Sequence, residues 1–163
     1  MTMVYGFAAP LSAWIWLFPA TLLVHLVEEY VGGVAFADSP RGMRGINISR
    51  PLFVILTGAG LLLVVAGVAA AQRFGFSQLM LAILGIFVLI NGISHTITTT
   101  LKAEYNPGVI SGLLLWIPLG AMTLVRVKGN MDGQRFWTGI ALGIISHAVV
   151  SLLARGKRKP GAA

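Results

Sequence analysis

Two adjacent glutamates inside an apolar stretch are the residues best suited to chemistry. Glu28 and Glu29 follow His25 by three and four positions, so a helix would place all three side chains on one face. An ionised carboxylate in hydrocarbon is costly unless it is paired, hydrogen-bonded or bound to a metal. The macrodipole also disfavours negative charge near the C-terminal end of a helix. We therefore expect a compensating cation, shared protons or a metal beside these carboxylates.

The other histidines also lie within apolar segments. His95 shares a polar face with Asn91, and His147 continues a stripe of small residues, Gly139 and Gly143, at a spacing of four. Each of the three histidines lies in the later part of its segment, and the three segments run in the same direction across a membrane. We therefore expect the three imidazoles to lie at similar depth and to face the bundle interior.

Imidazole and carboxylate together are typical ligands of zinc, iron or manganese. The ligand set predicted for a divalent metal is His25, Glu28, Glu29, His95 and His147. His25, Glu28 and Glu29 are also candidate catalytic groups, with Glu29 as ligand or general base. Asn91 is expected to orient a ligand or a reactant. Such a metal would activate water or dioxygen against a lipid-like substrate.

The same residues can work without a metal. A glutamate with a raised pKa would protonate an alkene while a paired glutamate or histidine removes a proton, as an isoprenoid or sterol isomerase or cyclase requires. Aromatic faces would then stabilise positive charge. The residues expected to line a substrate site are Thr21, Ser94, Thr98, Tyr105 and Trp116.

The composition identifies the solvent around these residues. Of 163 residues, 56% are hydrophobic and only 10% are charged, against about a quarter charged in soluble domains. This excludes an ordinary cytosolic domain and indicates a membrane protein. The absence of cysteine excludes disulfides, thiolate metal sites and cysteine nucleophiles. The net charge of +7 fits basic loops beside anionic lipid better than binding to nucleic acid.

Continuous apolar stretches predict an all-α polytopic bundle of about five transmembrane helices, because none alternates with the period of two typical of barrel strands. The expected spans are 10–31, 52–72, 79–100, 107–126 and 134–154. They form a single transmembrane domain over residues 1–154, followed by a basic cytoplasmic tail at 155–163.

Basic residues in the loops predict the orientation. The side that carries the tail holds about twice as many of them as the other side, which places the N-terminus outside and the C-terminus in the cytoplasm of an inner (plasma) membrane. The expected partners are membrane lipids and a hydrophobic small-molecule substrate, with no nucleic acid. The Gly-x-x-x-Gly faces also suit contact between copies of the chain.

Three signatures in order resemble those of a known family. Residues 25–29 read H-x-x-E-E near the end of the first apolar segment, Asn91 and His95 form N-x-x-x-H in a later one, and a Tyr-x-Pro-Gly turn follows at 105–108. This pattern resembles the HXXEE-domain family of small bacterial integral membrane proteins, and the resemblance covers most of the chain. It implies a membrane fold in which the motif's histidine and glutamates are the defining residues, and it implies no particular reaction.

The hypothesis that best fits these observations is a membrane enzyme whose histidine and glutamate cluster binds a divalent metal and acts on a lipid or other hydrophobic substrate. A metal-free isomerase or cyclase is the first alternative. A small transporter or a protein that conducts protons or metal ions is the second, because buried glutamate and histidine also form relays.

Overall fold

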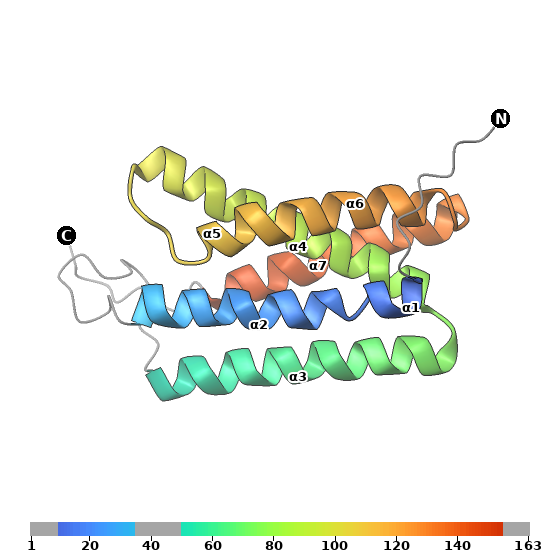
Figure 1. Cartoon of the computed structure of the whole chain (residues 1–163), viewed down its shortest axis with the longest axis horizontal. Helices are drawn as coiled ribbons and strands as arrows, with labels where there is room; N and C mark the ends of the chain where they lie inside the picture. Colours follow the sequence, from blue (N-terminus) through green and yellow to red (C-terminus); the bar gives the residue numbers. More distant parts are fainter. Residues whose placement is uncertain (1–9, 35–49, 155–163) are drawn as a thin grey trace.

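The chain folds as a bundle of helices. The computed structural model describes residues 10–34 and 50–154. In chain order the helices are α1 (Leu11–Trp14), α2 (Leu17–Glu29), the π-helical η1 (Tyr30–Val34), α3 (Arg50–Phe74), α4 (Ser77–Lys102), α5 (Val109–Ser111), the π-helical η2 (Gly112–Trp116), α6 (Ile117–Lys128) and α7 (Gly133–Ala154). Neither described range contains a strand, and the helices run side by side in Figure 1. The all-α prediction is confirmed.

Five segments are long and apolar enough to cross a membrane, as a multi-pass membrane protein requires. They are Leu11–Gly32, Pro51–Phe74, Ser77–Lys102, Val109–Lys128 and Gly133–Leu152. The predicted spans agree with them to within a few residues. The basic tail predicted at 155–163 lies outside the described residues, as do residues 1–9 and 35–49, and Arg41 and Arg44 of the latter range entered the predicted orientation.

Two prolines explain local breaks in helical geometry. Pro19 has no N–H, so the carbonyl of Ile15 lacks its usual donor four residues ahead, and the chain turns between α1 and α2 at this point. Pro118 likewise leaves the carbonyl of Leu114 without that donor, and Leu114 lies in η2. Single π-helical turns of this kind are frequent at functional sites.

α4 is the central helix and packs most extensively on α6 and α7. A Cβ atom built on Gly92 would lie 2.7 Å from the carbonyl oxygen of Gly112, and one built on Gly139 would lie 2.6 Å from Cβ of Ala82. Only glycine allows such close approach of the backbones. The small-residue faces predicted from the sequence therefore pack within one copy of the chain.

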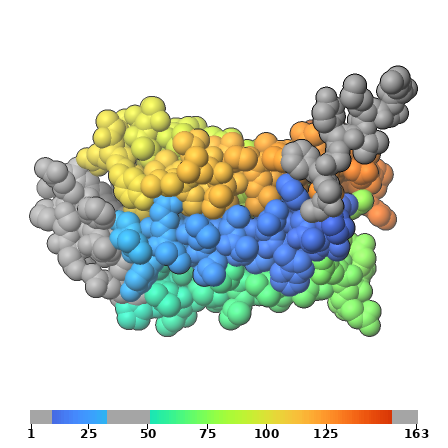
Figure 2. Space-filling view, in the orientation of Figure 1, coloured from blue at the N-terminus to red at the C-terminus, as the bar shows by residue number. Residues whose placement is uncertain are grey.

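The approach of Gly92 to Gly112 brings three parts of the chain together at one end of the bundle. These are the C-terminal end of α2, the later turns of α4, and the loop of residues 103–108 that leads into α5, all at the left in Figure 1. On the face drawn in Figure 2, α2 lies between α3 on one side and α5 with α6 on the other. The predicted chemical residues of α2 lie at this end.

Candidate functional site

His25 is the most deeply enclosed polar residue of the site. It lies one turn before the end of α2, and only 1% of its surface is exposed. Its ring stacks on Trp116 of η2, with centroids 3.7 Å apart and planes 23° apart, and it meets the ring of His95 edge-on at 5.0 Å. These contacts fix the imidazole plane, so the direction of its Nε2 atom is determined by packing.

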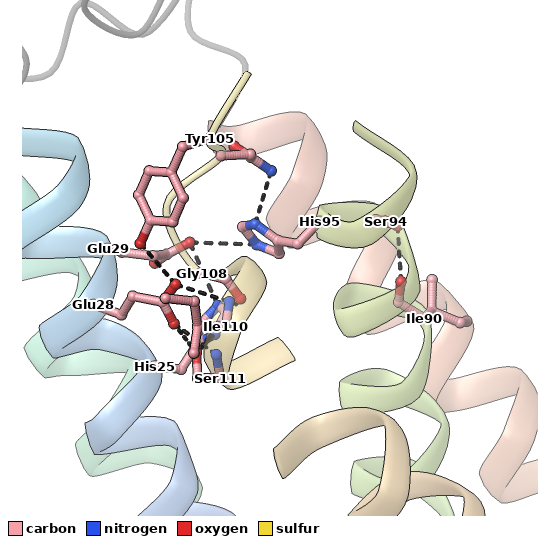
Figure 3. A network of polar contacts seen from close by, with 11 residues as sticks. His25, Glu28, Glu29, Ile90, Ser94, His95, Tyr105, Gly108, Ile110 and Ser111 are labelled. Atoms are coloured by element: carbon pink, nitrogen blue, oxygen red, sulfur yellow. Dashed lines mark hydrogen bonds and ion pairs between the residues drawn. The ribbon is translucent and has the colours of Figure 1, made fainter. Parts of the chain in front are cut away.

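Three side chains from two helices converge around one small volume. His25 and Glu29 are one turn apart on α2, and His95 reaches them from α4 (Figure 3). Nε2 of His25 and Nε2 of His95 lie 3.5 and 3.6 Å from Oε1 of Glu29. All three potential ligand atoms lie within 4.8 Å of one another.

These separations match the needs of a small cation. Ligand atoms about 2.0–2.2 Å from a tetrahedral ion lie roughly 3.3–3.6 Å apart. Both distances to Oε1 of Glu29 fall in that range. In addition, Nε2 of His25 is buried and has no hydrogen-bond partner, which costs about 1–3 kcal/mol for a polar group. The group of His25, Glu29 and His95 is therefore a candidate metal site, and we call it the His–Glu–His group.

Glu28 has a different environment from its neighbour. Its Oε1 accepts hydrogen bonds from the hydroxyl of Tyr105 and the N–H of Ile110, both at 2.9 Å. Its Oε2 accepts from the N–H of Ser111 at 2.7 Å and from the Ser111 hydroxyl at 2.5 Å. Both oxygens are thus occupied by protein donors, and we revise the predicted role of Glu28 from metal ligand to support of the site.

The charge of Glu28 is compensated by the start of another helix. Ile110 and Ser111 lie in the first turn of the span Val109–Lys128, and their free N–H groups point at the carboxylate. A helix N-terminus carries partial positive charge and binds anions. The sequence predicted a cation, shared protons or a metal for this purpose. The backbone N–H groups of the fourth span are a further source of compensation, which the sequence did not indicate.

The loop between α4 and α5 covers the site. Partial burial, together with the hydrogen bond to Glu28, raises the pKa of Tyr105 to about 12, so the phenol stays protonated and donates. The side-chain amide of Asn106 lies 2.9 Å from Nδ1 of His95. Gly108 has φ of +94°, and a Cβ atom there would lie 2.7 Å from Cε1 of both His25 and His95. The loop therefore fits between the imidazoles only with glycine at this position.

His147 is not brought to these residues. The metal-compatible group found in the described part of the chain is limited to His25, Glu29 and His95. His147 lies on α7 and meets the ring of Phe87 edge-on, with centroids 5.6 Å apart. Its expected place among the ligands is revised accordingly.

The other predicted residues divide into those near the group and those turned to their own helices. Tyr105 bonds to Glu28, and Trp116 stacks on His25. The hydroxyls of Thr21 and Ser94 instead bond carbonyls one turn earlier in their own helices. Asn91 and Thr98 have no described hydrogen bond through their side chains. The predicted orienting role of Asn91 therefore has no supporting contact among the described residues.

Three residues that support the site were not singled out as site residues from the sequence. Ser111, Asn106 and Gly108 all lie in the turn after α4 or in the first turn of the next span. The Tyr-x-Pro-Gly turn marked this region and its tyrosine, but not Asn106 or Ser111. A polar residue in the first turn of a span, three positions after a Pro-Gly turn, is the signal that would have identified Ser111.

Comparison with known proteins identifies a family without an activity. A family model described as "Protein of unknown function with HXXEE motif" matches residues 16–123, well over half of the chain. The matched range contains the His–Glu–His group and all the residues that contact it, whereas His147 lies beyond it. No curated protein and no solved structure gave a match.

Proposed function

We propose that this chain, which belongs to the HXXEE family, is a membrane-embedded enzyme that uses a divalent metal to act on a lipid or similar hydrophobic substrate. The metal would be held by His25, Glu29 and His95. The observation that carries this proposal is the buried, unpartnered Nε2 of His25, which faces a carboxylate oxygen shared with a second imidazole.

The chemistry of the ligands supports a catalytic rather than a structural metal. Two histidines and one carboxylate leave at least one coordination position for water or substrate, as in catalytic zinc sites and in non-haem iron sites. The side chains of Glu29 and His95 are 24% and 14% exposed, against 1% for His25. The open position would therefore lie on the side of Glu29 and His95.

The depth of the site favours a substrate whose reacting bond lies near the membrane surface. Glu29 is three residues before the end of the first span at Gly32, which corresponds to about 4.5 Å along a helix. Exposed apolar side chains flank it on two spans, Val27 and Val31 on one and Ile110 and Leu114 on the other. The acyl chains of a lipid would pack against these residues, and its ester or headgroup bond would lie at the metal.

Hydrolysis is the reaction that this position suits best. Water is available at the membrane boundary, and a divalent metal there would lower the pKa of a bound water and polarise an ester or phosphoryl oxygen. We further propose an inner membrane with the N-terminus outside, as the distribution of basic residues favours. The site would then face the cytoplasm.

Metal content tests the proposal directly. The purified protein is incubated with zinc, iron or manganese, desalted, and analysed for bound metal by mass spectrometry. We expect close to one ion per chain in the wild type and in His147→Ala, and loss of that ion in His25→Ala and His95→Ala. Wild-type protein that retains none of these metals contradicts the proposal and favours the metal-free acid–base alternative.

A further inference from the structure

The hydroxyl of Ser111 joins Glu28 to His25. Its Oγ lies 2.5 Å from Oε2 of Glu28 and 2.8 Å from Nδ1 of His25. A serine hydroxyl has one hydrogen to donate and lone pairs that accept. Because Oε2 of Glu28 is an acceptor, the single hydrogen of Ser111 is directed to it. Oγ must then accept from His25, which requires a proton on Nδ1.

This chain of donors determines the tautomer of His25. A neutral imidazole carries one proton, so a proton on Nδ1 leaves Nε2 with a free lone pair. That lone pair is directed toward Oε1 of Glu29, itself an acceptor, at 3.5 Å. Two acceptors that face each other need a proton or a metal cation between them.

His95 has different partners. Its Nδ1 faces the side-chain amide of Asn106, and rotation of that amide offers either a donor or an acceptor to the ring. The His95 ring also bonds the backbone of Pro107, so its partners differ in kind from those of His25. Among the described contacts of the two imidazoles, the hydrogen-bond chain through a serine to a glutamate belongs to His25.

We propose that Glu28 and Ser111 are positioning residues that hold His25 in the tautomer able to bind a metal through Nε2. This inference rests on the proposed function and divides the tasks of the paired glutamates. Glu29 binds the metal, whereas Glu28 acts through Ser111 on the far nitrogen of the ligand. The first turn of the fourth span supplies the backbone donors that keep Glu28 a carboxylate acceptor. Hydrogen bonds of this kind to metal-binding histidines orient the ring and raise metal affinity.

The test compares Ser111→Ala with Ser146→Ala. The hydroxyl of Ser146 bonds only the carbonyl of Leu142 in its own helix, so its loss controls for removal of a serine hydroxyl. Nitrogen-15 NMR of metal-free protein reports which imidazole nitrogen is protonated, and the His25 signal is assigned by its absence in His25→Ala. We expect the Nδ1–H tautomer in the wild type and in Ser146→Ala, and a mixture or the Nε2–H tautomer in Ser111→Ala.

Zinc titration supplies the second readout. Loss of a partner that orients a metal ligand weakens binding by about 10–100-fold, and we expect that range for Ser111→Ala and no more than about threefold for Ser146→Ala. Ser111→Thr keeps the hydroxyl and should restore the tautomer. If Ser111→Ala does not fold, Glu28→Gln takes its place. This substitution puts an amide against donors that need an acceptor, and it should change the tautomer in the same way.

The outcomes separate this inference from the proposed function. An unchanged His25 tautomer in folded Ser111→Ala or Glu28→Gln overturns the positioning role even if zinc binds. A wild type that has the Nδ1–H tautomer but binds no metal upholds the hydrogen-bond chain and overturns the metal function. A wild type with the Nε2–H tautomer overturns the positioning role by itself.

Discussion

Replacement of Gly108 by alanine tests whether the two imidazoles converge on the loop after α4. The new Cβ would lie 2.7 Å from Cε1 of His25 and from Cε1 of His95. Carbon atoms in contact are normally about 3.5–4.0 Å apart, so each ring would have to retreat by roughly 1 Å. Metal sites tolerate deviations of only about 0.2 Å in ligand distances. We therefore expect Gly108→Ala to weaken zinc binding by about 10–100-fold.

Gly75 provides a matched control for the backbone. It has φ of +77° in the turn between α3 and α4, and a Cβ atom there meets nothing within 4 Å. Alanine in the left-handed region costs about 1–2 kcal/mol at either glycine, so Gly75→Ala measures the cost of the backbone conformation alone, and Gly108→Ala should lose further stability through its contact with the rings. Zinc titration then isolates the contact with the rings. Wild-type affinity in Gly108→Ala, or an equal loss of affinity in Gly75→Ala, would refute the proposed geometry.

Three further results are expected. Trp116→Ala removes a side chain that is 1% exposed and stacked on His25, and it should lower the free energy of unfolding by about 3–5 kcal/mol; chemical denaturation should show a much smaller effect for Trp137→Ala, whose side chain is 64% exposed. Because the pKa of Tyr105 is about 12, about one tenth of this phenol is ionised at pH 11. Tyr105→Phe should therefore remove little tyrosinate absorbance at that pH. Loss of the absorbance of one full tyrosinate would contradict the bond to Glu28. Glu29→Asp withdraws the carboxylate by one methylene and should reduce bound metal well below one ion per chain, and retention of a full equivalent would exclude Glu29 as a ligand.

The spans and the convergence of His25, Glu29 and His95 could be predicted because they depend on local patterns. Apolar length identifies a span, and a spacing of four identifies one face of a helix. His25 and Glu29 also lie in the motif that describes the family matching the chain. These patterns sufficed to select the polar face of α2 and the face of α4 that meets it.

The place of His147 depends on how far one helix is shifted along another, which no single-helix pattern contains. Gly139 of α7 packs on Ala82 of α4, and His147 meets Phe87. Continued along both helices, this register puts His147 about five residues short of His95, or roughly 7 Å in depth. Equal positions within two spans therefore did not mean equal depth in the bundle.

The role of Glu28 was also hidden from the sequence, for a different reason. Apart from the Tyr105 hydroxyl, its donors are the N–H groups of Ile110 and Ser111 and the Ser111 hydroxyl, at separations of 82 and 83 residues. Backbone N–H groups have no signature in side-chain composition. The sequence showed that the carboxylate needed compensation, but only the packing of the fourth span on the first identified its source.

That separation in sequence also means that Glu28 and its donors are synthesised at different times. A ribosome adds about 5–20 residues per second, so Glu28 emerges roughly 4–17 s before Ser111. Throughout that interval the first span holds two acidic side chains, and the backbone N–H groups that will donate to Glu28 have not yet been made. Until then, its carboxylates need water or protons at the membrane boundary. Insertion of the fourth span therefore completes the hydrogen bonding of Glu28 in the first.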